Sequence, residues 1–333
     1  MKNILVTGGA GFIGSHTCVA LLEAGYSVVI ADNFSNSGPR TLERIREITG
    51  RDFVFCEADV TDRAAVEGIF KENNIDGVIH FAGFKAVGES VEKPLAYYYN
   101  NLVSTIELAK ACLSHRVKNF VFSSSATVYG DNKAPFTETM PLLPTTNPYG
   151  ETKVISERIL SDAAAANQGF SVTLLRYFNP VGAHESGLIG EAPNGIPNNL
   201  MPYITKVAKG ELKELRVFGD DYDTPDGTGV RDYIHVMDLA EGHAAALKKM
   251  SGFSVYNLGT GRGTSVLELV TAFERANSLK IPYRITPRRA GDIAVCYADA
   301  KKAERELGWK AKRTVEEMCR DAWRFEAGLR DEK

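Results

Sequence analysis

Residues 3–14 read Asn3-Ile4-Leu5-Val6-Thr7-Gly8-Gly9-Ala10-Gly11-Phe12-Ile13-Gly14, an apolar run followed by glycines at Gly-x-x-Gly-x-x-Gly spacing. The run predicts a buried strand, and the glycines predict a tight turn into a helix. At such a turn the backbone can approach a pyrophosphate, and the helix N-terminus offers unpaired N–H groups and the positive end of its dipole. We therefore expect a dinucleotide-binding unit with Gly8, Gly11, Phe12, Ile13 and Gly14 at the cofactor.

An acid follows this turn at the distance that a dinucleotide site requires. A second predicted strand ends at Asp32, about 20 residues after the glycines, where a carboxylate can hydrogen-bond the adenosine ribose hydroxyls. The same carboxylate would repel a 2′-phosphate, which favours NAD over NADP. The alternative is that Asp32 and Asn33 only form a turn.

Apolar β-branched runs alternate with helical stretches through the first half of the chain. Such alternation predicts a parallel sheet covered by helices on both faces. The predicted strands are Asn3–Thr7, Ser27–Ala31, Asp52–Cys56, Gly77–His80, Asn119–Ser123 and Ser171–Arg176. The predicted helices are Phe12–Glu23, Arg40–Thr49, Arg63–Glu72, Pro94–Ser114 and Tyr149–Ala166. The expected fold class is therefore α/β, a Rossmann-like doubly wound parallel sheet.

After Phe178 the pattern changes, and we expect a smaller C-terminal substrate-binding lobe. Residues 179–195 and 220–229 are rich in Gly, Pro, Asn or Asp and predict loops. The further predicted elements are helices over 196–209 and 266–276 and strands over 215–218 and 256–259. We expect residues 1–178 to form an NAD-binding domain, with later segments returning to its sheet. Residues 179–333 would mainly bind the substrate.

The bulk composition narrows the class of protein. The 333 residues carry a formal net charge of −3, which provides no overall basic field for nucleic acid or an anionic membrane. No apolar run reaches the roughly 20 residues of a spanning helix, and the first run breaks at Gly8, too early for a signal peptide. The five cysteines are scattered without a Cys-x-x-Cys pair, so neither a disulfide framework nor a metal site is expected. These features favour a cytoplasmic protein without nucleic-acid or membrane partners.

The prediction of a catalytic site rests on Tyr149 and Lys153. Asn147 and Pro148 favour a helix start just before them, and positions four apart share a helical face. An ammonium group beside a phenol favours the phenolate and lowers the tyrosine pKa, so Tyr149 could act as a general base or acid. The alternative is that Tyr149 only packs and Lys153 is solvated.

Serines follow the fifth predicted strand, in Ser123-Ser124-Ser125-Ala126-Thr127. The carboxyl ends of parallel strands line the ligand crevice of such a fold. Ser125 could hydrogen-bond the group that Tyr149 deprotonates. For Ser123 and Ser124 we expect only a turn cap.

The glycine spacing, the serine after the fifth strand and Tyr-x-x-x-Lys together resemble the extended short-chain dehydrogenase/reductase family, and within it the enzymes that epimerise nucleotide sugars. The resemblance covers nearly the whole chain. The stretches that carry it are Gly8–Cys18, Val78–Pro94, Phe122–Asp131, Leu175–His184, Gly195–Tyr203, Gly227–Asp238 and Pro287–Asp292. It implies NAD-dependent epimerisation at the 4-position of UDP-hexoses, interconverting UDP-galactose and UDP-glucose through a 4-keto intermediate, with NAD tightly held and recycled in place.

Two other functions remain open at this point. Related sugar-nucleotide dehydratases and decarboxylases carry an acidic residue just after the active serine or threonine, because they move a second proton. Ala126 and Thr127 stand there in this chain, and neither can do so. A non-catalytic NAD-binding sensor is the third possibility, and the presence of Ser125, Tyr149 and Lys153 argues against it.

The resemblance also implies which residues line the site. Five cofactor-binding positions are expected already because they follow the third and fourth predicted strands, where such ligands bind: Asp59, Val60, Phe81, Ala82 and Gly83. Beyond these, the glycine turn and Asp32, the cofactor-binding positions are Asn33, Asn36, Lys85, Asn100, Ser125, Tyr149, Lys153 and Phe178. The substrate-binding positions are Lys85, Ser125, Tyr149, Asn179, Asn199, Leu200, Arg216, Val217, Phe218, Arg231, Arg289, Asp292 and Cys296. Arg231 and Arg289 would grip the diphosphate, because a guanidinium group meets phosphate oxygens in pairs. The alternative for both is a salt bridge, with Asp232 or Asp292 as partner.

Cys296 stands where some members of the family carry a tyrosine. A smaller side chain leaves room for a 2-N-acetyl group, so UDP-N-acetylglucosamine and UDP-N-acetylgalactosamine are also expected to interconvert. The alternative is that Cys296 is only a small buried residue.

The helices over 94–114 and 149–166 resemble the pair that forms a four-helix dimer interface in this family. A homodimer is therefore expected. The same helical faces could equally serve only to cover the sheet.

Overall fold

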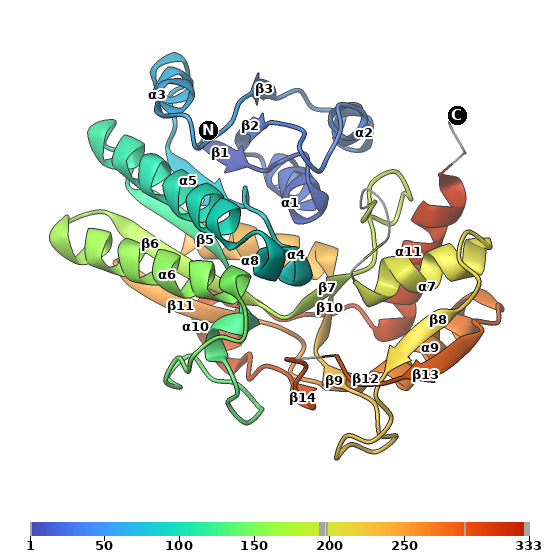
Figure 1. Ribbon diagram of the computed structural model, residues 1–333. Helices are drawn as coiled ribbons and strands as arrows, with labels where there is room; N and C mark the ends of the chain where they lie inside the picture. The colour runs from blue at the N-terminus through green and yellow to red at the C-terminus, as the bar shows by residue number, and fades with distance from the viewer. Residues whose placement is uncertain (1, 193–196, 198, 290, 330–333) are drawn as a thin grey trace.

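A seven-stranded parallel sheet forms the centre of the computed structural model, which describes residues 2–192, 197, 199–289 and 291–329 (Figure 1). The strand order is β11-β6-β5-β4-β1-β2-β3, so the chain reverses its direction of travel across the sheet between β1 and β4. The strands are β1 (Asn3–Thr7), β2 (Ser27–Asp32), β3 (Val54–Glu57), β4 (Gly77–His80), β5 (Asn119–Ser125), β6 (Ser171–Tyr177) and β11 (Phe253–Leu258). The predicted doubly wound α/β class is confirmed.

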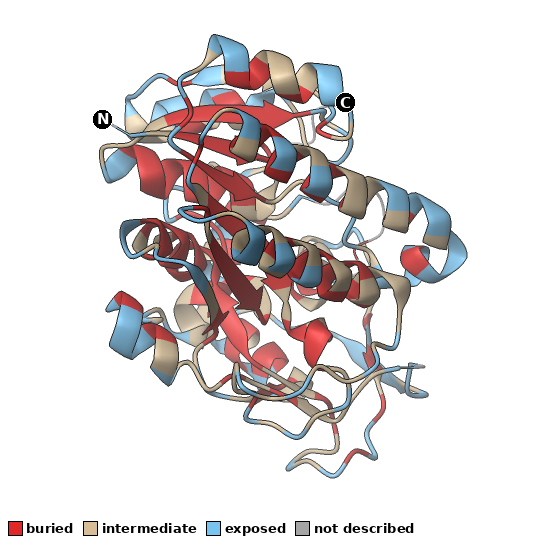
Figure 2. Ribbon diagram, turned by 90° about the vertical axis from the view of Figure 1, so that its left-hand side faces the viewer, coloured by how far each residue is buried: buried red, intermediate tan, exposed pale blue. Residues whose placement is uncertain are grey.

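Helices cover both faces of this sheet. Alternate residues of β1 show why: Ile4 and Val6 pack with α1 (Phe12–Glu23), whereas Leu5 packs on the opposite face. The first face also carries α2 (Arg40–Thr49), α8 (Val236–Lys248) and α10 (Lys301–Leu307). The second carries α3 (Arg63–Glu72), α5 (Pro94–Ser114) and α6 (Pro148–Ala166). Figure 2 shows the buried strands between helices that are exposed on their outer sides.

A smaller lobe lies beyond the carboxyl ends of the strands and has its own apolar core (Figure 1). Its helices are α7 (Leu200–Lys209), α9 (Val266–Asn277) and α11 (Val315–Gly328). Its strands pair in small sheets: β8 (Leu215–Phe218) with β13 (Tyr283–Thr286), β7 (Asn179–Val181) with β10 (Tyr233–His235), and β9 (Val230–Arg231) with β12 (Thr264–Ser265) and β14 (Val295–Cys296). None of the helices in the described ranges is both long and apolar enough to cross a membrane.

The predicted elements of the first half agree with the structure to within two residues at each end. The predicted loop over 179–195 is wrong at its start, because Asn179–Val181 forms β7. The helix expected over 196–209 is observed from Leu200, while Ile196 and Asn198 lie outside the described residues. The predicted strands over 215–218 and 256–259 are observed as β8 and β11, and the predicted helix over 266–276 is observed as α9. The other elements that were not predicted are α4 (Val87–Glu92), the 3-10 helix η1 (Ala126–Tyr129), α8, α10, α11, β9, β10, β12, β13 and β14. Strands of two or three residues, such as β9, β10, β12 and β14, are too short to show a periodic pattern, so their pairing partners decide them.

The glycine turn between β1 and α1 depends on close backbone packing. Gly8 has a φ of 68°, and a Cβ on Gly14 would lie 2.2 Å from the Gly8 carbonyl oxygen. Because that oxygen belongs to the backbone, it cannot move aside without opening the turn. The turn therefore requires glycine at both positions.

Replacing Gly14 with alanine is expected to lower the free energy of unfolding by about 1–3 kcal/mol, because the added methyl group overpacks the turn. Thermal and denaturant unfolding would measure the change. Gly68→Ala is the matched control: Gly68 lies in α3 with open space around it, so alanine should be neutral or stabilise the protein by up to about 1 kcal/mol. Equal stability of the two variants would contradict the close-packing argument.

Candidate active site

The start of α6 presents Tyr149 and Lys153 toward the end of β5. The Asn147 side chain caps the helix by accepting the Gly150 N–H at 2.9 Å, and Pro148 occupies the first turn, as predicted. The Lys153 ammonium lies 5.8 Å from the centre of the Tyr149 ring and donates to the Ser123 carbonyl at 2.7 Å. Lys153 is buried, so the solvated alternative for it is excluded.

Ser125 ends β5 opposite Tyr149, and the two hydroxyls share a hydrogen bond. The Ser125 oxygen also accepts the Thr127 hydroxyl at 3.0 Å and caps η1 by accepting the Thr127 N–H at 3.3 Å. The expectation that Ser123 or Ser124 caps a turn is therefore wrong. The cap belongs to Ser125, while the Ser124 hydroxyl donates to Glu157 at 2.5 Å.

The pKa of Tyr149 shifts in the direction opposite to the one expected. Burial raises it above the usual 10, and the Ser125 hydrogen bond opposes that rise. Burial lowers the pKa of Lys153 to about 8, while the Glu157 carboxylate raises it. The sequence predicted an effect of the Lys153 charge on Tyr149, whereas desolvation is the largest cause of the pKa shift for both groups, and at Tyr149 it is opposed by Ser125 rather than by Lys153.

The cofactor end of the site is built on the glycine turn. Gly11 is the N-cap of α1 and supplies no side-chain cap, so the first helical N–H groups remain available to an anion. The Asp32 carboxylate accepts the Ala10 N–H at 3.0 Å and the Ser37 hydroxyl at 2.8 Å, which fixes the turn against the end of β2. The Gly8–Gly14 approach also leaves no room for side chains. These features fit a dinucleotide pyrophosphate.

The remaining predicted cofactor residues lie at the neighbouring strand ends. Asn33 donates to Asp59 at 3.5 Å, joining the ends of β2 and β3, whereas Asn36 is exposed. Phe81, Ala82 and Gly83 directly follow β4, and Phe178 directly follows β6. Val60 and Phe178 are buried, and Phe12 and Ile13 open α1 and are partly buried.

Asn101 organises the loop after β4. The sequence indicated only its neighbour Asn100 as a site residue. The Asn101 side chain accepts the Phe84 N–H at 2.8 Å and donates to the Phe84 carbonyl at 3.1 Å and to Thr152 at 3.0 Å. Asn100 donates to Asn101 at 3.0 Å. No spacing rule singles out a buried amide whose partners lie far away in sequence.

Glu191 is a second residue that the sequence analysis missed. It pairs with Lys85 at 3.1 Å and accepts the Asn199 side chain at 2.7 Å. Glu191 thereby joins Lys85 and Asn199, two predicted site residues that lie far apart in the sequence. Leu200, also predicted, begins α7 directly after Asn199.

The two predicted phosphate-binding arginines come together around Asp292. Its carboxylate lies 3.1 Å from Arg289 and 3.9 Å from Arg231, and the Arg289 guanidinium lies 4.7 Å from the centre of the Phe218 ring. The sequence left Asp232 open as a partner, but its carboxylate accepts the N–H groups of Thr260, Gly261 and Ala298 and the Thr260 hydroxyl. Asp232 therefore holds the loops around the arginines together.

Cys296 lies on β14 beside Arg231 of β9. It is 9% exposed and packs in one apolar cluster with Phe178 and Ala126. Burial raises its pKa to about 11, so the group is a neutral thiol. This cluster joins the cofactor and substrate halves of the predicted site.

Two predicted substrate positions are neighbours on one strand of the small lobe. Both are on β8: Arg216 is exposed, and Val217 is buried in the core of the small lobe. Asn179 begins β7, where its N–H donates to the Asp232 carbonyl at 2.9 Å. A ligand could reach Val217 only through its backbone.

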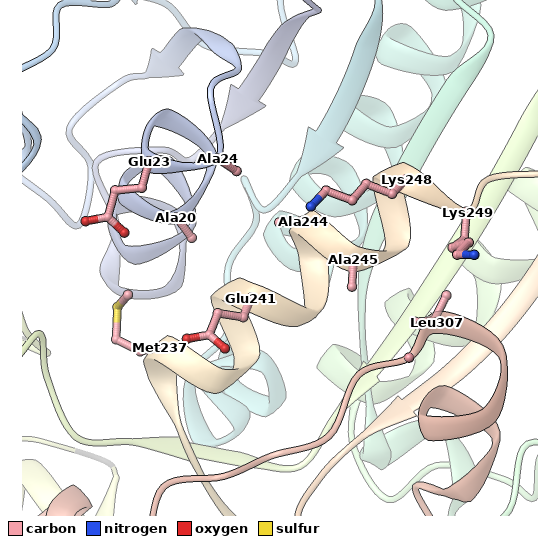
Figure 3. A pocket seen from close by; sticks show the side chains of 11 residues that line it. Ala20, Glu23, Ala24, Met237, Glu241, Ala244, Ala245, Lys248, Lys249 and Leu307 are labelled. Carbon is pink, nitrogen blue, oxygen red and sulfur yellow. The ribbon is translucent and has the colours of Figure 1, made fainter.

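A surface groove of about 370 Å³ lies between α1, α8 and the end of α10 (Figure 3). Glu23, Glu241, Lys248 and Lys249 line it together with small and apolar side chains. None of its lining residues belongs to the predicted site, and α1 and α8 cover the sheet face opposite α6. The groove is therefore separate from the Tyr149 site.

The sheet order, the glycine turn and the Ser125, Tyr149 and Lys153 cluster define a dinucleotide-binding enzyme of the short-chain dehydrogenase/reductase type. Residues 4–259 match the NAD dependent epimerase/dehydratase family. The chain belongs to this family, whose cofactor is NAD.

Known relatives agree with this assignment. UDP-glucose 4-epimerase of Bacillus subtilis is 61% identical, over 97% of this chain and 96% of the relative. The crystal structure of UDP-glucose 4-epimerase from Bifidobacterium longum in complex with NAD+ and UDP has a TM-score of 0.95 and 58% identity, over 98% of each chain. The UDP-Glc/GlcNAc 4-epimerase of Campylobacter jejuni has a TM-score of 0.86 and 38% identity, over 99% of this chain and 100% of that one.

Proposed function

We propose that Ser125, Tyr149 and Lys153 carry out NAD-dependent epimerisation at the 4-position of UDP-hexoses. The enzyme interconverts UDP-galactose and UDP-glucose. The observation that carries the assignment of the residues is the Tyr149 hydroxyl, hydrogen-bonded to Ser125 at the carboxyl end of β5 and lying beside the Lys153 ammonium. The identity to UDP-glucose 4-epimerases over nearly the whole chain supports the reaction over dehydration or decarboxylation.

Tyr149 removes the proton of the sugar 4-hydroxyl, directly or through Ser125. When bound, NAD would supply a positive charge that favours the phenolate and a reversible acceptor for the hydride of C4. Lys153 stabilises the phenolate and binds ribose hydroxyls of the cofactor. The 4-keto sugar rotates so that it presents the opposite face of C4. Tyr149 then returns the proton to the C4 oxygen. No net oxidation occurs.

Residues 1–178, with the segments that return to their sheet, form the NAD-binding part in this proposal, and residues 179–333 mainly bind the UDP-sugar. NAD lies along the glycine turn, Asp32 and the predicted residues at the strand ends. Arg231 and Arg289 hold the diphosphate in the position that Asp292 sets between them. A firm grip on the nucleotide leaves the hexose free to turn.

Cys296 sets the size limit at the sugar end. Its small, uncharged side chain packs with Phe178 and Ala126 and leaves room for a 2-N-acetyl group. The enzyme then also interconverts UDP-N-acetylgalactosamine and UDP-N-acetylglucosamine. A solved relative of this chain is itself a UDP-Glc/GlcNAc 4-epimerase.

We further propose a cytoplasmic homodimer. Leu95 and Tyr99 lie one turn apart on α5 and are 82% and 65% exposed, and Ile106 follows them on the same helix. Val91 of α4, the helix just before α5, is also exposed, at 62%. A second copy of the same surface would bury these side chains in a two-fold interface.

Replacing Tyr149 with phenylalanine is expected to lower kcat by about 10²–10⁴, because the proton-transferring hydroxyl is lost. Conversion of UDP-galactose to UDP-glucose without added cofactor would measure the change, with the NAD content of the purified variant checked by absorbance. Tyr283→Phe, which removes an exposed hydroxyl on β13, is the control. Undiminished turnover by the Tyr149 variant would remove the basis of the proposed mechanism.

Replacing Cys296 with tyrosine is expected to abolish turnover of the N-acetylated pair and to spare UDP-galactose, because the ring fills the space beside the sugar. The two activities would be measured side by side by chromatography of the products. Cys296→Ala keeps the residue small and should retain both activities. If the tyrosine variant loses or keeps both equally, Cys296 does not set the size limit.

A double variant, Leu95→Asp with Tyr99→Asp, is expected to be monomeric, because two carboxylates cannot be buried in an apolar interface. Sedimentation velocity would compare it with the unaltered protein. Ile285→Asp places a charge on an exposed apolar residue of β13 and should leave the assembly unchanged. A monomeric unaltered protein, or a double variant that still dimerises, would exclude this interface.

A further inference from the structure

A buried carboxylate lies one helical turn beyond the catalytic pair. Tyr149, Lys153 and Glu157 are spaced four apart on α6 and so share one helical face. Glu157 is only 5% exposed. The mechanism described above does not use it, although a buried carboxylate is costly unless it is fully paired.

Glu157 is paired by two neighbouring strands. The Arg176 guanidinium of β6 donates from Nε at 3.0 Å and from Nη2 at 2.7 Å, a two-point ion pair. The Ser124 hydroxyl of β5 donates at 2.5 Å. The Arg176 guanidinium also lies 4.8 Å from the centre of the Tyr129 ring, so it contacts Tyr129 as well as Glu157.

Three consecutive serines thus contact three residues of one helical face. Ser125 hydrogen-bonds Tyr149, Ser123 accepts Lys153 through its carbonyl, and Ser124 donates to Glu157. The last of these contacts is anchored by an ion pair and sets the position of α6 along β5. A shift at Glu157 would move Ser125 relative to Tyr149.

The charge of Glu157 also acts on Lys153. Burial lowers the pKa of the ammonium group to about 8, and the Glu157 carboxylate raises it. Two further titratable groups lie near the lysine: the Tyr149 phenol, and His80, whose imidazole is held neutral because burial lowers its pKa to about 3. Arg176, which pairs with Glu157, counters part of the field of that carboxylate.

We propose that Glu157 is a positioning residue for the epimerase reaction: its carboxylate keeps Lys153 protonated and holds Ser125 in place against Tyr149. The proposal rests on the catalytic roles proposed above for Ser125, Tyr149 and Lys153. A role in folding alone would leave the pH dependence of the reaction unchanged.

The test compares the pH profile of kcat in Glu157→Gln and the unaltered enzyme, with bound NAD retained. An ammonium group is present below its pKa, so loss of the carboxylate should move the alkaline limb to lower pH. A shift of one pH unit gives about a tenfold extra loss of rate on that limb relative to the neutral region. Glu157→Asp keeps the charge and should keep the limb near its original position.

Two controls separate the possible failures. Asp162→Asn removes an exposed carboxylate from the same helix and should change neither rate nor profile. Because Glu157→Gln leaves Arg176 buried without a counter-charge, the pair Glu157→Gln with Arg176→Met provides a variant with no unpaired charge. If the alkaline limb of the kcat profile stays in place in both variants, whatever rate they lose at neutral pH, the proposal is overturned. The proposed function is tested separately, by turnover of UDP-galactose in the unaltered enzyme.

Discussion

The packing of α6 against the end of β5 is the interaction on which the site depends. The Lys153 ammonium is held by the Ser123 carbonyl at 2.7 Å, and the neighbouring serines contact Tyr149 and Glu157 from the same strand. A strand end and a helix start are both stiff elements, so the reacting hydroxyl is positioned without a mobile loop. The parallel sheet brings this strand end to the same edge as the glycine turn.

Acidic residues hold the rest of the site in place. Asp32 fixes the glycine turn, Asp232 fixes the loops beside β9 and β14, and Asp292 lies between two arginines. Glu191 joins Lys85 to Asn199. Most of these carboxylates join N–H groups or cations from distant parts of the chain, and Asp292 also pairs with Arg289, three residues away. The basic groups available to a nucleotide are therefore already oriented by the protein.

The two halves of the molecule suit two different tasks. The cofactor side is built from rigid strand ends and from a turn so tight that it excludes a Cβ. In the proposed function the small lobe binds the UDP-sugar, with Arg231 on the short strand β9 and Arg289 between β13 and β14. An epimerase needs this asymmetry, because the cofactor stays in place while the hexose turns over. The small, neutral Cys296 lies where the two halves meet.

Much of the fold could be predicted because its signals are local. The strand and helix around the glycine turn, the capped start of α6 and the shared face of Tyr149 and Lys153 all follow from patterns within a few residues. The short strands β9, β12 and β14 could not be predicted, because pairs of residues become strands only through their partners. The same holds for the partners of Asn101, Glu157 and Glu191, which lie far away in sequence.

The pKa shift of Tyr149 separates what the sequence determines from what only the tertiary structure decides. The sequence by itself determined that an ammonium group lies one turn from the phenol, because helix geometry fixes that spacing. Only the tertiary structure decided that burial raises the pKa of Tyr149 and lowers that of Lys153, because desolvation depends on everything packed around a group.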